Sequence, residues 1–193
     1  MPYWKYRPYD TVDLRDRTWP NVVLSKAPIW CSVDLRDGNQ ALVNPMDAAR
    51  KRRFFDLLVE LGFKEIEVGF PAASKTDFDF VRMLVDEELI PDDLTIAVLT
   101  QARPELIERT YEALEGTTRA IVHLYNSTST VQRRVVFGMD RADVRELAVR
   151  ATALCRQLAE QADGNIVFEY SPESFHHTEL DFALEICEAV AAE

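Results

Sequence analysis

Short apolar segments alternate with longer amphipathic segments along most of this chain. The apolar segments lie at residues 29–33, 66–70, 94–99, 120–125 and 166–170. Each has the length of a β-strand, and its residues are apolar without alternation, as in parallel strands that are buried on both faces. The pattern therefore predicts five short strands of a parallel sheet.

A helical spacing of apolar residues follows each predicted strand. In the first of these segments, that spacing is formed by Phe54, Phe55, Leu57, Leu58 and Leu61. We predict that Asn44-Pro45 caps this helix and that Gly62 ends it. Further helices are predicted over 75–88, 104–114 and 141–161, and from about residue 178 onward.

Strict alternation of strands and helices predicts a parallel sheet with right-handed crossovers. Polar or otherwise unusual residues fall just after the strands, at Arg36-Asp37, Gly69-Phe70-Pro71, Thr100-Gln101, Asn126-Ser127 and Ser171–Glu173. In a TIM (β/α)8 barrel this end of the strands is the catalytic face. An open doubly wound sheet is the alternative, but it usually carries a glycine-rich phosphate turn after its first strand, and none occurs here. We predict an α/β fold that is a partial TIM (β/α)8 barrel of about five βα units.

The first 25 residues differ from the rest of the chain. They are rich in Pro, Tyr and Trp and show neither a helical nor a strand period. We predict an irregular N-terminal arm over 1–25 that is ordered only by packing on other structure. Residues 26–193 then form the N-terminal portion of the catalytic barrel, and 193 residues suit one domain rather than two.

Composition narrows the class of protein. The net charge of -11 argues against a nucleic-acid partner, because no basic surplus exists to displace counterions from phosphates. No apolar run approaches the length of a membrane span, and the first residues lack the apolar core of a signal peptide. The three cysteines, Cys31, Cys155 and Cys187, each lie among apolar residues without paired spacing, which predicts small core side chains in a reducing compartment. We therefore expect a cytoplasmic protein.

The segment Leu35-Arg36-Asp37-Gly38-Asn39-Gln40 carries the strongest chemical signal. It lies where the first predicted strand gives way to a turn. Asp37 can hold a hard divalent metal, which prefers oxygen ligands. Arg36 can offer a planar fork of N–H donors to a carbonyl, carboxylate or enolate oxygen. An isolated Arg-Asp-Gly is more often a solvated turn with a surface ion pair, and only the wider context favours the functional interpretation.

Four further side chains are candidates for the same site. His123 ends an apolar strand pattern, where a lone histidine is more often a core residue than a ligand. Ser171 and Glu173 flank Pro172 and can reach the mouth of a barrel together, although this pattern also fits a helix-capping turn. Glu67 lies within a strand, where an unpaired carboxylate is costly, so we expect it to anchor Arg36 or a neighbouring polar group.

These segments resemble those of a known family of enzymes that form and break carbon–carbon bonds. Residues 35–40, with Lys51 eleven residues later, are similar to the first signature of that family. It includes 2-isopropylmalate synthase, homocitrate synthase, citramalate synthase and hydroxymethylglutaryl-CoA lyase. Segments 65–71, 122–129 and 168–174 are similar to the long, actinobacterial 2-isopropylmalate synthases within it. The resemblance covers essentially the whole chain.

The resemblance implies a reaction and its partners. It implies a Claisen-type condensation of acetyl-CoA with 2-oxoisovalerate to 2-isopropylmalate, the first committed step of leucine biosynthesis. The oxo acid would chelate a divalent cation, Mg²⁺, Mn²⁺ or Zn²⁺, which polarises its ketone. Homocitrate synthase, citramalate synthase and a related lyase are alternatives within the family. The resemblance also implies a homodimer.

The resemblance also implies roles for individual residues. Asp37 corresponds to the metal-binding aspartate, and Arg36 would stabilise charge on the carbonyl or enolate oxygen. His123 and Ser171 would bind the oxo acid. Glu173 would be a substrate contact or a participant in proton transfer.

Other residues would support that site, and one family feature is missing. Gln40 and Lys51 would support the first loop, Lys51 through the first helix, while Glu67 would act behind Arg36. The family's second signature, with its His-x-His metal ligands, does not occur in these 193 residues. His176-His177 is a poor substitute, because adjacent residues point in different directions. We therefore expect the chain to be inactive by itself, and a non-catalytic truncated fragment is the alternative of another class.

Overall fold

The computed structural model describes residues 2–7, 16 and 25–193. The predicted arm over 1–25 thus lies largely outside the described residues. Its described part includes one turn of 3₁₀ helix at Tyr3–Lys5.

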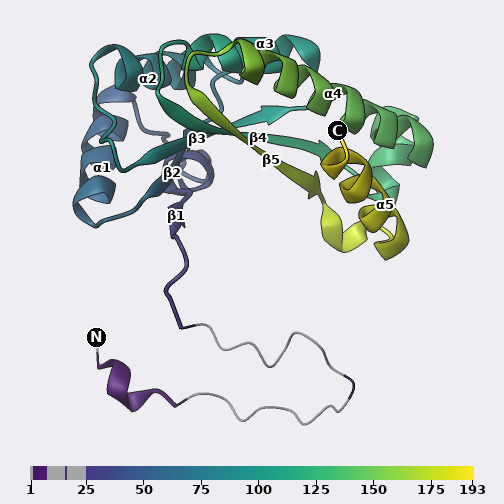
Figure 1. Ribbon diagram of the computed structural model, residues 1–193, viewed down its shortest axis with the longest axis horizontal. Coiled ribbons are helices and arrows are strands. Elements are labelled where there is room, and N and C mark those ends of the chain that lie inside the picture. The colour runs from purple at the N-terminus through teal and green to yellow at the C-terminus, as the bar shows by residue number, and fades with distance from the viewer. Residues whose placement is uncertain (1, 8–15, 17–24) are drawn as a thin grey trace.

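A parallel sheet is the centre of the fold. Its strands are β1 (Cys31–Ser32), β2 (Glu65–Gly69), β3 (Thr95–Gln101), β4 (Arg119–Ser127) and β5 (Asn165–Glu173). All neighbouring pairs are parallel, and the spatial order is β1-β2-β3-β4-β5 (Figure 1). The helices between and after them are α1 (Ala48–Glu60), α2 (Lys75–Asp86), α3 (Pro104–Leu114), α4 (Arg141–Gln161) and α5 (Leu180–Ala191). The predicted alternation and the predicted parallel sheet are both confirmed.

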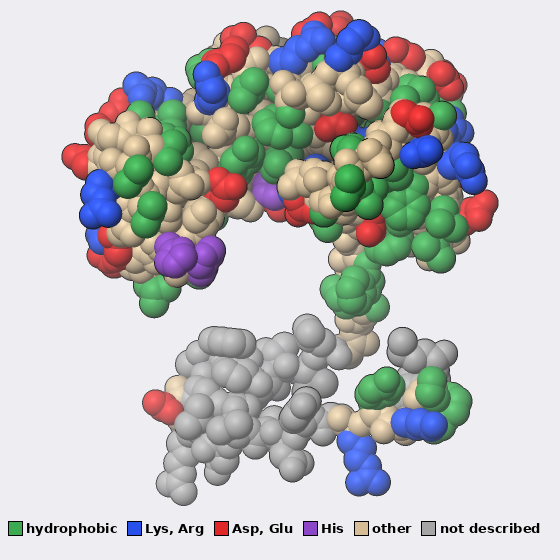
Figure 2. Space-filling model, turned by 180° about the vertical axis from the view of Figure 1, so that it is seen from behind, with side chains coloured by type: hydrophobic (Ala, Val, Ile, Leu, Met, Phe, Trp, Pro, Cys, Tyr) green, Lys and Arg blue, Asp and Glu red, His purple; other side chains and the backbone are tan. Residues whose placement is uncertain are grey.

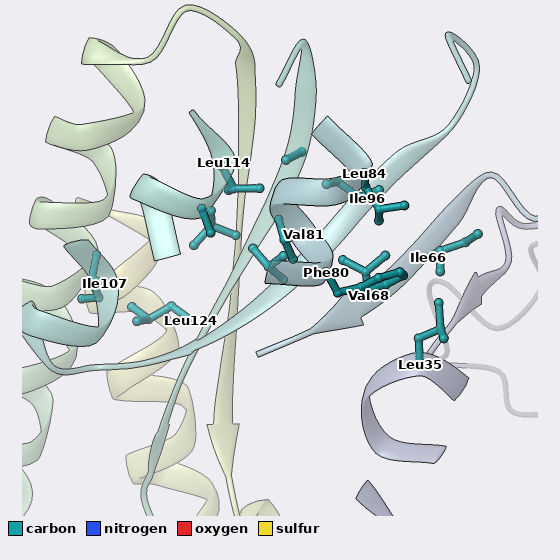
Figure 3. Packing of buried hydrophobic residues seen from close by; sticks show 14 of the residues in the cluster. Leu35, Ile66, Val68, Phe80, Val81, Leu84, Ile96, Ile107, Leu114 and Leu124 are labelled. Atoms are coloured by element: carbon teal, nitrogen blue, oxygen red, sulfur yellow. The ribbon is translucent and has the colours of Figure 1, made fainter. Parts of the chain in front are cut away.

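The hydrophobic core lies between the sheet and the helices that cover one of its faces (Figures 1 and 3). Alternate residues of each strand point to that face. The core is formed by Ile66 and Val68 of β2, Ile96 and Val98 of β3, and Val122 and Leu124 of β4, packed on Phe55, Phe80, Val81, Leu84 and Ile107 of the helices. Leu35, on the turn after β1, is also fully buried.

The other face of the sheet carries both apolar side chains, such as Ala97 and Ile121, and polar ones, so the prediction that the strands are apolar on both faces holds only in part. Glu67 of β2 and His123 of β4 alternate with the core residues and belong to this second face. β5 is an edge strand whose residues are exposed or half-buried. Glu67, Ala97 and Ile121 on this second face are buried, so β2, β3 and β4 are shielded from solvent on both faces at these positions.

Two local predictions at the start of the fold are also wrong. β1 is limited to two residues, because only Cys31 and Ser32 pair with β2, and Ile29 and Trp30 are exposed. Asp47, rather than Asn44-Pro45, caps α1, since its side chain accepts a hydrogen bond from the Arg50 N–H at 2.8 Å. The predicted end holds, with Gly62 at a φ of 88° directly after the helix.

The cysteine prediction is confirmed for one of three residues. Cys155 of α4 is buried in the core. Cys187 of α5 is half-buried, and Cys31 is exposed because β1 lies at the edge of the sheet.

Lys51 joins α1 and α2 to the end of β2. Its side chain is fully buried, and its ammonium pairs with the Asp77 carboxylate of α2 and donates to the Val68 carbonyl at 3.3 Å. Asp77 also accepts a hydrogen bond from the Phe70 N–H at 3.1 Å. The expectation that Lys51 supports the first loop is therefore corrected: its polar contacts support the β2–α2 connection. A Cβ at Gly69 would come within 3.1 Å of Asp77, so this approach favours glycine.

Replacing Lys51 with Met should lower the free energy of unfolding by about 3–5 kcal/mol, because Asp77 loses its buried partner. The measurement is urea denaturation of the protein in its natural length. Lys75→Met is the matched control, since Lys75 forms an exposed pair with Asp79 and should contribute about 0–1 kcal/mol. Equal shifts in the two variants would contradict the prediction.

Candidate active site

A cavity of about 400 Å³ opens at the carboxyl ends of the strands. It is lined by Arg36, Asp37, Gln40, Phe70, Leu99, His123, Tyr125, Ser171 and Glu173. The expectation that Arg36, Asp37, His123, Ser171 and Glu173 converge at this end is confirmed. Gln40 joins them, whereas Glu67 lies behind the cavity wall and Lys51 lies among the helices.

Arg36 and Asp37 project from a π-helical turn, Asp34–Gly38, that follows β1. The buried Leu35 holds this turn against the core. The Arg36 guanidinium donates to the Glu67 carboxylate through Nε at 2.9 Å and through Nη2 at 2.7 Å. Its Nη1 pairs with Asp37, whose side chain is 49% exposed. The turn therefore presents a restrained cation beside an accessible carboxylate.

Glu67 connects Arg36 to His123, as expected for a carboxylate within a strand. One oxygen accepts from Arg36, and the other lies 3.3 Å from Nδ1 of His123. Ala97 of β3 is in register with Glu67, and the contact between Glu67 and His123 crosses β3, which lies between β2 and β4. Burial alone would raise the pKa of the Glu67 carboxyl, but hydrogen bonds from His123 and Arg36 outweigh burial and hold that pKa below its ordinary value. The carboxylate is ionised at neutral pH.

Glu67 should make stability depend on pH. Its folded pKa lies below its unfolded value of about 4.5, so its contribution is present above pH 4.5 and is lost as the pH falls through the folded pKa. We expect Glu67→Gln to be less stable at pH 7 and to lose less stability on acidification. Unfolding free energies between pH 3 and pH 7 measure this difference. Glu65→Gln, on the same strand, is the control, and identical pH slopes in the two variants would exclude the linkage.

His123 also contacts Ser171. Its Nε2 lies 2.7 Å from the Ser171 Oγ and 3.7 Å from a carboxylate oxygen of Glu169. β4 and β5 pair in parallel, with Tyr125 opposite Ser171. This register places Ser171 on the strand next to His123, within reach of the imidazole. Arg36, Glu67, His123 and Ser171 are thus joined in one continuous line of polar contacts.

Glu173, the last residue of β5, is fixed by the end of β4. Its carboxylate accepts a hydrogen bond from the Ser127 hydroxyl, and its carbonyl accepts from the Thr128 N–H at 3.1 Å. The carboxylate therefore faces the cavity from a restrained backbone.

Sequence reasoning did not identify the aromatic part of the wall. Phe70 and Tyr125 meet edge to face, with ring centroids 6.3 Å apart, and Leu99 lies beside them on the cavity lining. Burial, followed by the charge of Glu173, raises the pKa of the Tyr125 hydroxyl. The position of Phe70 directly after a predicted strand was the available signal. Nothing in the strand pattern distinguished Leu99 or Tyr125 from core residues.

The residues that the structure describes do not supply a complete set of metal ligands. They contain no group of three or more His, Cys, Asp or Glu side chains placed to hold a metal ion. Asp37 and Glu173 are the carboxylates that line the cavity. His176 and His177 have ring centroids 4.2 Å apart on a turn beyond β5 and do not line it, and Figure 2 shows histidine side chains in two separate places.

The fold and the site define a βα-barrel protein whose polar site lies at the carboxyl ends of its parallel strands. The profile of the HMGL-like family matches residues 27–193, and the chain belongs to this family. The predicted partial TIM barrel and the family resemblance are both confirmed.

Named relatives match nearly the whole chain. A 2-isopropylmalate synthase of Parafrankia sp. (strain EAN1pec) is 65% identical over 192 residues, covering 98% of this chain and 34% of the relative. The 2-isopropylmalate synthase of Rhodospirillum rubrum is 64% identical over 191 residues, covering 98% and 34%. That of Agrobacterium fabrum is 61% identical over 186 residues, covering 96% and 33%. The chain spans about a third of the length of the curated relatives that it matches.

Within the described residues, no helix is both long enough and apolar enough to cross a bilayer.

Proposed function

We propose that the protein to which this chain belongs is a 2-isopropylmalate synthase. It would be a cytoplasmic, homodimeric acyltransferase that condenses acetyl-CoA with 2-oxoisovalerate to give 2-isopropylmalate for leucine biosynthesis, with residues 26–193 as the N-terminal portion of its catalytic barrel. The observation that carries this proposal is the identity of 60–65% to proteins of that name over nearly the whole chain. The convergence of polar side chains on one cavity supports it.

A divalent cation, Mg²⁺, Mn²⁺ or Zn²⁺, would supply Lewis-acid polarisation of the ketone when bound. Asp37 fits one ligand position, because its carboxylate lines the cavity and half of its side chain is accessible. The described residues do not complete the donor set, so the other ligands would come from outside them.

Arg36 would stabilise negative charge on the reacting oxygen. Glu67 fixes the guanidinium through two contacts, so the fork is oriented before substrate binds. A preorganised cation stabilises developing charge without the cost of reorientation during the reaction.

The remaining wall residues would hold the oxo acid. His123 and Ser171 offer an imidazole and a hydroxyl to its oxygens, and Gln40 adds an amide on the cavity lining. The Phe70–Tyr125 pair forms an apolar surface that fits a branched aliphatic side chain. Glu173 would contact substrate or take part in proton transfer, since its carboxylate reaches the same cavity.

The test is an assay of thiol release from acetyl-CoA by the protein in its natural length. We expect turnover with 2-oxoisovalerate to exceed turnover with 2-oxoglutarate. Chelation of metal should abolish turnover, and added Mg²⁺, Mn²⁺ or Zn²⁺ should restore it. A preference for 2-oxoglutarate would move the assignment to homocitrate synthase. If neither oxo acid supported thiol release, the proposal would be overturned.

A further inference from the structure

Ser171, His123 and Glu67 have the arrangement of a nucleophile, a base and an orienting carboxylate. The Ser171 Oγ lies 2.7 Å from His123 Nε2, and His123 Nδ1 lies 3.3 Å from Glu67 Oε1. Hydroxyl, imidazole and carboxylate follow one another through opposite nitrogens of the ring. This is the connectivity that activates a serine in hydrolases of unrelated folds.

The surroundings favour one protonation pattern in these three residues. Glu67 is almost fully buried, and its second oxygen is held by Arg36, so it presents one acceptor to His123. A ring proton on Nδ1 would bond Glu67 and leave the lone pair of Nε2 for the Ser171 O–H. The Glu169 carboxylate also faces Nε2, but it lies farther away, at 3.7 Å, and is half exposed. Both Ser171 and His123 line the cavity, whereas Glu67 lies behind them.

A donor for a developing oxyanion lies in the same cavity. The Arg36 guanidinium carries five N–H groups, and three of its contacts are made through Nε, Nη1 and Nη2 to Glu67 and Asp37. Nη1 and Nη2 each carry a second N–H group, which would bind the oxygen of a tetrahedral intermediate, since the contacts of Arg36 with the described residues use only one N–H of each nitrogen.

We propose that Ser171, His123 and Glu67 hydrolyse the acyl-CoA thioester that condensation produces. This inference rests on the proposed function: adding the acetyl group of acetyl-CoA to an oxo acid yields a CoA thioester, and release of the free acid requires water. Ser171 and His123 would thus serve the second half of the reaction in addition to binding the oxo acid in the first.

The step balances with water as its only co-reactant. The Ser171 Oγ forms a bond to the thioester carbon while its proton moves to His123 Nε2. The C–S bond breaks, and the CoA sulfur leaves with that proton. Water then attacks the ester carbon and passes a proton to His123, the C–O bond to Ser171 breaks, and the proton returns to the Ser171 Oγ. The products are the carboxylic acid and CoA thiol.

The experiment separates condensation from hydrolysis in the natural-length protein. With acetyl-CoA and 2-oxoisovalerate, mass spectrometry should detect free 2-isopropylmalate from the unaltered protein and its CoA thioester from Ser171→Ala. Chemically prepared 2-isopropylmalyl-CoA, supplied directly, tests hydrolysis without condensation. We expect Ser171→Ala to slow this hydrolysis about 100-fold or more, and Ser171→Cys to retain the acyl group as a mass increase on the protein.

Glu67 acts through His123, so its variant is tested by the separate effects on kcat and KM. Glu67→Gln should lower kcat for 2-isopropylmalyl-CoA more than it changes KM, because an amide stabilises the imidazolium formed during the step less than a carboxylate does. His176→Gln and Ser25→Ala, both exposed and outside the cavity, are the matched controls and should hydrolyse normally.

The outcomes distinguish the two proposals. If the unaltered protein forms neither the free acid nor its thioester from acetyl-CoA and the oxo acid, the proposed function fails, and the prepared thioester still tests the three residues. If the Ser171→Ala variant hydrolysed that thioester at the rate of the unaltered protein, the inference would be overturned. Loss of condensation in Ser171→Ala with unimpaired hydrolysis would assign Ser171 to oxo-acid binding only.

Discussion

Replacing Arg36 with Lys should lower kcat for condensation by about 100-fold or more, with a much smaller change in KM for the oxo acid. The guanidinium contacts Glu67 through two nitrogens and Asp37 through a third. A lysine ammonium keeps the charge but cannot make these contacts and also present N–H groups to an oxyanion. The change therefore removes stabilisation that matters most in the transition state.

The measurement is steady-state thiol release at saturating metal. Arg103→Lys is the matched control, because Arg103 is exposed at the start of α3, pairs with Glu105 and does not line the cavity. A rise in KM with unchanged kcat would show instead that Arg36 contributes equally to binding of substrate and transition state.

The 193-residue chain expressed by itself should self-associate and show no condensation activity. Among the described residues β5 pairs with β4 on one side only, which leaves the backbone N–H and C=O groups that point to its other edge without a strand partner. Val167 and Phe168 on this strand are 45% and 37% exposed, and Leu180 and Leu184 of α5 are also exposed. An open apolar edge strand is a template for pairing with another copy.

Size-exclusion chromatography with light scattering measures the self-association. Val167→Lys should reduce it, because a charge on an edge strand opposes strand addition. Val43→Lys adds the same charge at another exposed position and should have little effect. A monodisperse monomer that condenses acetyl-CoA with 2-oxoisovalerate would contradict the prediction.

Much of the fold was predictable because local sequence patterns are sufficient for it. Helical spacing and helix-ending residues are short-range properties, so α3 and α4 begin and end at the predicted residues, 104–114 and 141–161. The link from Glu67 to Arg36 was predictable for a different reason. A carboxylate within a buried strand needs a partner, and Arg36 was the cation at the neighbouring strand end.

Other features depended on contacts between distant residues. Lys51 lies in an amphipathic helix, and the pattern of that helix predicts a lysine exposed to solvent. The packing of α1 on α2 instead buries Lys51 beside Asp77. The exposure of Cys31 and the short β1 follow from the position of that strand at the sheet edge. The residues that neighbour them in the sequence predict neither the burial of Lys51 nor the edge position of β1.

The amino-acid sequence by itself determined the order of strands and helices, the parallel sheet and the group of side chains at the strand ends, because periodicity and strand-end position are local properties. The tertiary structure alone decided how His123 and Ser171 connect to that group. The bond between His123 and Ser171 joins residues 48 positions apart and depends on the register of β4 with β5. A shift of one residue would turn Ser171 to the opposite face of the sheet. The observed register is therefore what joins Ser171 to the polar contacts of Arg36, Glu67 and His123.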